Sequence, residues 1–179
     1  MMKKVVVGNR IPYEFFTVCG VGESDISTHA GSFHLALADA GIECYNIVNY
    51  SSILPRVATE VVKPGKYVHG SVLETIMARV DGVKGQRLTA GIEYGWLVNS
   101  NSGKRYGGLV VEYMEHGTEQ EAKMTLDVML NELYDVTDKK KFTLMDRRTI
   151  VKSFVPEKKY GTALVALGFV SYILNVKLL

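Results

Sequence analysis

Two long strand-like segments joined by a short polar loop constrain the fold more than any other feature of this 179-residue sequence. Leu88–Val98 and Tyr106–Met114 are rich in the β-branched and aromatic residues that favour strands. The loop between them, Asn99–Lys104, reads Asn-Ser-Asn-Ser-Gly-Lys, and its small polar residues and glycine are typical of turns. The sequence therefore predicts an antiparallel β-hairpin within a larger sheet.

Other segments with strand patterns flank this hairpin on both sides. Apolar and β-branched runs predict three further strands, at Tyr13–Cys19, Cys44–Tyr50 and Thr149–Val155. The glycine-rich segment Gly20–Asp25 predicts a turn. The mainly apolar run Thr162–Leu174 is expected to be a buried strand or helix of the core.

Three segments carry helix patterns. Phe33–Ala40 is expected to form a short helix that ends at Gly41, the left-handed residue that commonly follows a helix, and Gly70–Val80 is expected to form a second one. The third helix begins after Thr118, because Thr-Glu-Gln-Glu gives a capping box with Glu121 at its third position. The apolar residues that recur at helical spacing after it, and so share a buried face, are Ala122, Leu126, Met129, Leu130 and Leu133.

Strands outnumber helices in this pattern, and the helices are expected to cover the sheet. The predicted fold class is therefore α/β or α+β. A length of 179 residues corresponds most simply to one domain, spanning residues 1–179, and a hydrophobic content of 47% is enough for a real core.

The charge balance excludes some classes of partner. Lysine and arginine number 21 against 19 acidic residues, which argues against nucleic acid or a membrane surface as the main partner. The basic cluster Lys139–Lys141 is expected in a solvated loop, and no stretch approaches the 18 apolar residues of a membrane span. Cys19 and Cys44 lack metal-ligand spacing and are expected to be buried thiols of a cytoplasmic protein.

Several familiar catalytic motifs are missing from the sequence. The four histidines form no zinc motif of the His-Glu-x-x-His type; they are His29, His34, His69 and His116. No Gly-x-Ser-x-Gly elbow surrounds a serine, and the glycines of Gly20–Asp25 lack the spacing of a dinucleotide fingerprint. We therefore expect no metal site, no ordinary serine hydrolase and no dinucleotide cofactor.

Two features remain as candidates for chemistry. Ser51 and Ser52 follow a strand-like run and precede Pro55, so on composition alone they form a polar turn. Glu112 lies between Val110 and Met114 on one face of its predicted strand. If that face is buried, the pKa of Glu112 rises and the carboxyl becomes a candidate general acid; if the face is exposed, Glu112 is an ordinary solvated carboxylate.

The run His29–Pro55 resembles the pyruvoyl-dependent arginine decarboxylases. Four other segments share the resemblance in the same order along nearly the whole chain; they are Gly20–Asp25, His69–Ala78, Gly107–Tyr113 and Lys158–Phe169. Its most specific part is Asn46, followed at five and six residues by the two serines, with the pair Glu112-Tyr113 later in the chain.

The resemblance implies a role for each of these residues. Ser52 would attack the carbonyl of Ser51, cleave the chain into residues 1–51 and 52–179, and become a covalent pyruvoyl group. Asn46 would assist this self-processing, because its side-chain amide can stabilise an oxyanion. Glu112 would then be the proton donor of a reaction that converts L-arginine to agmatine and CO2, a step that can supply polyamine synthesis.

One position departs from the family pattern and bears on the substrate. His34 stands where family members often carry an aspartate that faces the substrate guanidinium. A neutral imidazole cannot pair with a cation as a carboxylate does, so Glu23 and Asp25 are alternative candidates for that contact. Two other functions stay open: decarboxylation of another amino acid such as histidine or lysine, and an uncleaved binding or structural subunit.

The resemblance also implies the architecture and the assembly. It implies a four-layer αββα sandwich that forms a homotrimer or a dimer of trimers, with active sites between protomers. The ketone would replace pyridoxal phosphate as the electron sink, so we expect neither that cofactor nor a metal.

Overall fold

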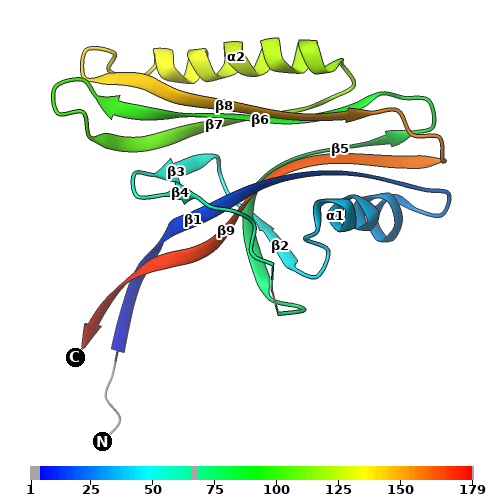
Figure 1. Cartoon of the computed structure of the whole chain (residues 1–179), viewed down its shortest axis with the longest axis horizontal. Coiled ribbons are helices and arrows are strands. Elements are labelled where there is room, and N and C mark those ends of the chain that lie inside the picture. The colour runs from blue at the N-terminus through cyan, green and yellow to red at the C-terminus, as the bar shows by residue number, and fades with distance from the viewer. Residues whose placement is uncertain (1–4, 66–67, 179) are drawn as a thin grey trace, which may run out of the picture.

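Two β-sheets pack face to face and each carries a helix on its outer face (Figure 1). The computed structural model describes residues 5–65 and 68–178. The elements in chain order are β1 (Val5–Ser24), a π-helical turn η1 (Thr28–Phe33), α1 (His34–Ala40), β2 (Asn46–Asn49), β3 (Ile53–Pro55), β4 (Thr59–Glu60), β5 (Val72–Val83), β6 (Leu88–Asn99), β7 (Arg105–Glu115), α2 (Glu119–Asp135), β8 (Phe142–Phe154) and β9 (Tyr160–Leu178).

The strand order explains how the two sheets are built from one chain. The five-stranded sheet has the order β2-β5-β9-β1-β4, and the four-stranded sheet has the order β3-β7-β6-β8. Helix α1 lies against the first sheet and α2 against the second, which gives the four layers α2, sheet, sheet and α1 (Figure 1). The fold is therefore α+β and agrees with the expected αββα sandwich.

Three apolar clusters hold the layers together. The largest lies between the two sheets and contains Phe15, Leu54, Ile92 and Val165. A second joins α1 to the five-stranded sheet, and a third joins α2 to the four-stranded sheet through the buried residues Ala122, Leu126 and Leu130. Burying these side chains is the main source of stability, at roughly 25 cal/mol per Å² of apolar surface.

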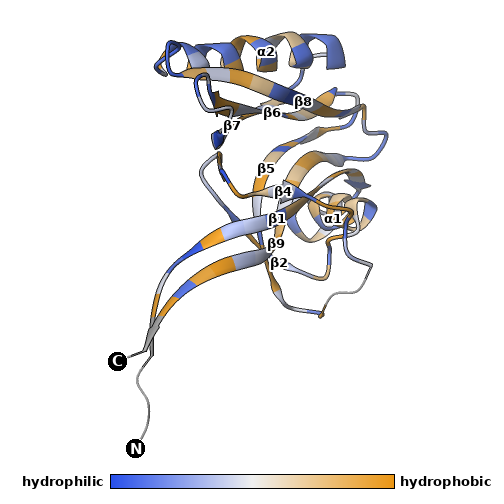
Figure 2. Cartoon of the chain, turned by 60° about the vertical axis from the view of Figure 1, so that its left-hand side comes forward, coloured by the Kyte–Doolittle hydropathy of each residue, from blue (hydrophilic) through white to orange (hydrophobic). Residues whose placement is uncertain are grey.

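Strands β1 and β9 form the longest antiparallel pair of the protein. They pair from Ser24 and Tyr160 at one end to Val5 and Leu178 at the other. Beyond the sandwich the pair continues as a two-stranded arm that carries both termini (Figures 1 and 2).

Several sequence-based predictions are confirmed. The hairpin forms from β6 and β7, and Gly41 adopts the left-handed conformation at φ +66° after α1. The capping box is present, since the Thr118 side chain accepts from the N–H of Glu121 while the Glu121 carboxylate accepts from the N–H of Thr118. Residues Lys139–Lys141 lie in an exposed turn, and the segment Thr162–Leu174 is a strand within β9.

The predicted helix at Gly70–Val80 was wrong, because this segment is strand β5. Leu73 and Met77 pack toward α1, whereas Ile76 and Val80 pack into the core between the sheets. A strand buried on both faces has a nearly continuous apolar run, and these four positions happen to match helical spacing.

The predicted turn at Gly20–Asp25 was also wrong, because β1 continues to Ser24. A Cβ atom on Gly20 would lie 2.2 Å from the Ala36 carbonyl oxygen, and one on Gly22 would lie 2.2 Å from that of Ser32. These glycines therefore let the helical segment approach the strand closely; they do not turn the chain.

Smaller differences concern burial at single positions. Leu133 on α2 is 40% exposed, and Met129 is only partly buried, so the buried face of this helix is narrower than its spacing predicts. Cys19 and Cys44 are free thiols that are partly, not fully, buried. Among residues 5–65 and 68–178, no helix is long and apolar enough to cross a bilayer.

Candidate active site

The serine pair lies where the chain crosses from one sheet to the other. Strand β2 belongs to the five-stranded sheet and β3 to the four-stranded sheet, with Ser51 and Ser52 between them. The Tyr50 N–H donates to the Thr75 carbonyl oxygen at 2.7 Å, and the Val110 N–H donates to the Ser52 carbonyl oxygen at 3.3 Å. Each sheet therefore anchors its own side of the pair.

The edge position of β3 explains why Pro55 is tolerated there. Strand β3 pairs only with β7 in its sheet, with Ile53 opposite Leu109 and Pro55 opposite Gly107. Proline has no N–H to give to a ladder, so an edge strand is where a sheet accepts it. The sequence Ile-Leu-Pro thus ends the crossover and fixes Ser52 against β7.

Ser52 and Glu112 are in direct contact. The Ser52 hydroxyl donates a hydrogen bond to Oε1 of Glu112, and both side chains are half-buried. Burial raises the pKa of Glu112 above its ordinary value of 4.5, and the hydrogen bond from Ser52 lowers it. Val110, on the same face of β7, is 1% exposed, so this face points into the space between the sheets.

The backbone holds the carbonyl of Ser51 in a tight turn. Its oxygen accepts a hydrogen bond of 2.8 Å from the N–H of Ile53, so the chain turns around Ser52. A donor aimed at this oxygen would also stabilise negative charge on it during attack at the carbonyl carbon. Ser51 itself is exposed.

Asn46 lies at the opposite end of β2 from the serine pair. Its side-chain Nδ2 donates to the Gly70 carbonyl oxygen at 2.7 Å, which links the start of β2 to the residue before β5. Within the described part of the chain, the Asn46 amide therefore contacts Gly70, and the Ser51 carbonyl is held by Ile53.

His34 lines a cavity of about 570 Å³ beside α1 and β2. The residues that surround this cavity are His29, Ala30, Phe33, His34, Leu37, Glu43, Tyr45, Asn46 and Ile47. We call it the α1 cavity. It brings together His34 and Asn46, which the sequence singled out, and Glu43, which it did not.

Glu23 and Asp25 lie away from the α1 cavity. The Glu23 carboxylate accepts from the backbone N–H of Glu157 at 2.7 Å and of Lys158 at 3.3 Å, and the Asp25 carboxylate accepts from that of Lys159 at 3.1 Å. These acids therefore hold the turn between β8 and β9 against the end of β1. The structure does not bring them to His34.

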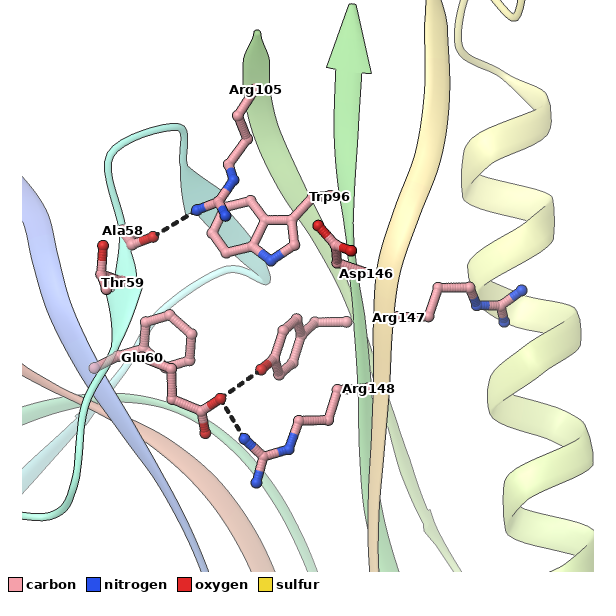
Figure 3. A pocket seen from close by; sticks show the side chains of 10 residues that line it. Ala58, Thr59, Glu60, Trp96, Arg105, Asp146, Arg147 and Arg148 are labelled. Atoms are coloured by element: carbon pink, nitrogen blue, oxygen red, sulfur yellow. Dashed lines mark hydrogen bonds and ion pairs between the residues drawn. The ribbon is translucent and has the colours of Figure 1, made fainter. Parts of the chain in front are cut away.

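A second cavity, of about 400 Å³, lies between the sheets beside β4 and β8 (Figure 3). Glu60 accepts hydrogen bonds of 2.8 Å from both the Thr17 and Tyr94 hydroxyls, and it pairs with Arg148. Burial and the neighbouring Glu60 raise the pKa of Tyr94 to about 12. The polar groups here satisfy one another and tie the two sheets together.

An irregularity in β8 aims the arginines beside this cavity in opposite directions. Asp146 adopts a left-handed conformation at φ +49°, where the pairing of β8 with β6 shifts register. Arg147 then points toward α2 and pairs with Glu93 at 2.6 Å, while Arg148 points toward Glu60 (Figure 3). In residues 5–65 and 68–178, no group of three or more His, Cys, Asp or Glu side chains is placed to hold a metal ion.

Comparison with known proteins gives one consistent result. The family model described as pyruvoyl-dependent arginine decarboxylase matches residues 14–173. Pyruvoyl-dependent arginine decarboxylase AaxB of Chlamydia abortus is 32% identical to this chain over 191 residues, which cover 92% of this chain and 94% of the relative. The AaxB protein of Chlamydia muridarum is also 32% identical, with the same coverage of both chains. Pyruvoyl-dependent arginine decarboxylase 2 of Archaeoglobus fulgidus is 35% identical over 127 residues, which is 67% of this chain and 77% of the relative. Since the match spans residues 14–173, which include Ser52 and Glu112, the chain belongs to the pyruvoyl-dependent arginine decarboxylase family.

Proposed function

We propose that the chain cleaves itself between Ser51 and Ser52, and that the new residue at position 52 is the pyruvoyl group of an arginine decarboxylase that forms agmatine and CO2. The observation that carries this proposal is the contact between the Ser52 hydroxyl and the half-buried carboxyl of Glu112 at the crossover between the sheets. It joins a nucleophile, a scissile peptide bond and an acid in one place.

The local geometry fits formation of the pyruvoyl group. In the first step the Ser52 oxygen bonds to the Ser51 carbonyl carbon, the peptide C–N bond breaks, and the hydroxyl proton passes to the freed amine, which leaves an ester. Elimination then separates the chains and leaves dehydroalanine at position 52, which water converts to a ketone with loss of ammonia. Both sides of the cut stay anchored, because β2 pairs with β5 and β3 pairs with β7.

Two groups are candidates to stabilise the oxyanion of the first step. The Ile53 N–H already lies 2.8 Å from the Ser51 oxygen. The Asn46 amide, which the family resemblance favours, is bound to the Gly70 carbonyl and would have to leave it. Asn46 lies at the opposite end of β2 from Ser51 in the same chain. We therefore propose that Ile53 provides the donor already in place, and that the Asn46 amide of a neighbouring protomer joins it as charge develops.

Glu112 is proposed to be the acid of the decarboxylation. The pyruvoyl ketone, when present, supplies the electrophile that holds the substrate amine and draws electrons as CO2 leaves. Glu112 must then hold a proton and deliver it to the substrate α-carbon. Burial favours the protonated form, and conversion of Ser52 to a ketone removes the one hydrogen bond that lowers the pKa of Glu112.

The assembly is part of the proposal. We propose that cleaved protomers form a homotrimer or a dimer of trimers, and that the active site draws on more than one protomer. The α1 cavity and the serine pair lie at opposite ends of β2 in one chain, so a site that uses both would combine the cavity of one protomer with the serine pair of another.

One preparation tests the proposal. A denaturing gel and an intact mass should show fragments of residues 1–51 and 52–179, the larger one without a free amino group at its N-terminus. The same sample should release CO2 from arginine. A single band near 19.9 kDa would instead support an uncleaved binding or structural subunit.

His34 is the reason to test substrates other than arginine. The α1 cavity presents this histidine where many family members carry an aspartate, so arginine must be compared with lysine and histidine under the same conditions. His34→Asp is the diagnostic variant. If arginine turnover appears only in His34→Asp, the natural substrate is another amino acid.

A further inference from the structure

Glu43, which lines the α1 cavity, has a carboxylate oxygen without a partner in the part of the chain that the structure describes. Glu43 follows α1 and lines the cavity, and its Oε1 accepts from the Cys44 thiol at 3.7 Å. Its Oε2 is buried and receives no hydrogen bond from any described residue. A buried carboxylate oxygen is normally paired, so an orphaned one on a residue of a cavity wall points to a donor that the described residues do not supply.

The rest of the wall favours a cation on an apolar stem. Ala30, Phe33, Leu37 and Ile47 give the cavity apolar sides, and none of its described lining residues is a lysine or an arginine. Glu43 is therefore the one acidic residue among the described residues that line the cavity. A ligand with several N–H donors and a positive charge would satisfy it.

Two basic residues that contact Phe33 or the end of α1 already have partners. Arg79 stacks on the Phe33 ring at 3.7 Å, and its guanidinium pairs with Asp81 at 2.6 Å. Lys63 donates to the carbonyl oxygens of Ala40 and Gly41, at the end of α1, at 3.2 and 3.1 Å. Neither is a partner of the Glu43 Oε2.

We propose that Glu43 binds the guanidinium group of the substrate in the α1 cavity. This inference rests on the proposed function for the identity of the ligand, but the need for a cationic donor rests on Glu43 itself. It also supplies the negative charge that His34 cannot. Glu43 lies two residues after Gly41 and lines the same cavity as His34.

The cavity and the serine pair are too far apart in one chain for a single arginine molecule to reach both. Asn46 lines the cavity and begins β2, and the serine pair lies beyond the other end of this strand. Asn46 and Asn49 alone are separated by roughly 10 Å, at about 3.3 Å per strand residue. An arginine whose guanidinium lies in the cavity of one protomer would therefore react with the pyruvoyl group of a neighbouring protomer, as the proposed assembly allows.

The test compares charged and neutral ligands on matched variants. Glu43→Gln removes the charge and keeps the shape, Glu43→Asp keeps the charge, and Glu119→Gln removes an exposed carboxylate from the far side of the molecule on α2. Binding of agmatine and of N-carbamoylputrescine, its neutral urea counterpart, is measured by calorimetry. The KM and kcat for arginine are measured on the same preparations.

We expect Glu43→Gln to weaken agmatine binding and raise the KM for arginine by about 10–100-fold, which is typical for loss of a charge-assisted hydrogen bond, with a smaller change in kcat. The affinity of Glu43→Gln for the neutral urea should change by less than about threefold. Glu43→Asp should recover part of the lost affinity for agmatine. Glu119→Gln should match the wild type.

The outcomes separate this inference from the proposed function. If wild-type protein decarboxylates arginine and Glu43→Gln has the same KM and agmatine affinity, Glu43 is not the guanidinium contact and the proposed function stands. If wild-type protein stays uncleaved and inactive while agmatine binding still depends on Glu43, the proposed function fails and the cation site stands. Equal weakening of both ligands would show a structural role for Glu43 and overturn the inference.

Discussion

The Ser52 hydroxyl donates a hydrogen bond to Glu112, a residue 60 positions later on β7. In the proposed mechanism this contact couples self-cleavage to decarboxylation. Before cleavage, burial raises the pKa of Glu112, and the hydrogen bond from Ser52 offsets part of this increase. After cleavage the hydroxyl no longer exists, so processing itself should convert Glu112 into a group that keeps its proton at higher pH.

The first prediction concerns the two serines, which are adjacent but not equivalent. Ser52→Ala removes the attacking oxygen, so the chain should remain whole and release no CO2 from arginine. Ser51→Ala keeps the carbonyl that is attacked and changes only an exposed side chain, so cleavage should continue. Denaturing gels of both variants provide the measurement. Cleavage of Ser52→Ala at the same bond would refute the assignment of Ser52.

The second prediction concerns Glu112 as the acid. Glu112→Gln keeps the shape of the side chain but cannot deliver a proton, so the turnover of arginine should fall by about 10²–10⁴-fold while the chain still cleaves. Glu115→Gln, an exposed position on the same strand, is the control and should behave as wild type. Near-normal CO2 release by cleaved Glu112→Gln would show that another group is the acid. A variant that does not cleave would place Glu112 in maturation.

The third prediction follows from the direction of the pKa shift. Burial raises the pKa of Glu112 in the folded state, so the folded chain binds this proton more tightly than the unfolded chain. The stability that Glu112 contributes is complete below its ordinary pKa of 4.5 and is lost as pH rises through the raised value. Glutamine does not titrate, so Glu112→Gln should gain stability relative to its parent as pH increases.

The Ser52→Ala background suits this measurement, because the chain stays whole and the hydroxyl that lowers the pKa of Glu112 is absent. Melting temperatures of Ser52→Ala and of the double variant with Glu112→Gln should diverge as pH rises above 4.5, the ordinary pKa of glutamate, until the raised pKa of the folded chain has been passed. In the cleaved enzyme, kcat should fall as pH rises through the same titration. Melting curves with a constant difference across this range would mean that Glu112 is not buried as described.

The fourth prediction concerns the electron sink. Dialysis without pyridoxal phosphate, followed by a metal chelator, should leave arginine turnover unchanged, because the covalent ketone is retained by the chain. Carbonyl reagents should inactivate the cleaved protein and leave Ser52→Ala unmodified at position 52. Activity that is lost on dialysis and restored by pyridoxal phosphate would contradict this account.

The sequence singled out Ser52 and Glu112, which the structure brings into contact, but it did not predict their surroundings. Ser52 and Glu112 carry a local pattern, namely a strand end with a proline and an acid between apolar neighbours. The contact between them depends on how β3 pairs with β7, which the sequence does not state. The sequence did not single out Glu43, because nothing in Ile-Glu-Cys marks it. Its place at a cavity wall depends on how α1 packs against the five-stranded sheet.

The errors in the fold have the same origin. Strand β5 was predicted as a helix because burial on both faces removes the alternation that identifies a strand. Gly20 and Gly22 were taken for a turn because glycine marks turns and close approaches alike, and only the position of the helical segment distinguishes them. Where one face alone is buried, as in α2, the spacing and the capping box identified the helix correctly.

The last prediction tests which donor serves self-processing. The Ile53 N–H is in place at 2.8 Å from the Ser51 oxygen, whereas the Asn46 amide is 2.7 Å from the Gly70 carbonyl oxygen. If Asn46 joins Ile53 in the transition state, Asn46→Ala should slow cleavage without preventing it, by about 10²-fold, the usual cost of one oxyanion donor.

Asn49→Ala is the matched control, because Asn49 lies on the same strand and its side-chain oxygen accepts from the Thr75 hydroxyl at 2.8 Å. The measurement is a time course on freshly synthesised chain, resolved on a denaturing gel. Asn46→Asp should be slower still, because it places a negative oxygen where the amide would act. If Asn46→Ala and Asn49→Ala both cleave at the wild-type rate, Asn46 is not an oxyanion donor and Ile53 remains the candidate. The Asn46 amide would then serve only to bind the Gly70 carbonyl oxygen.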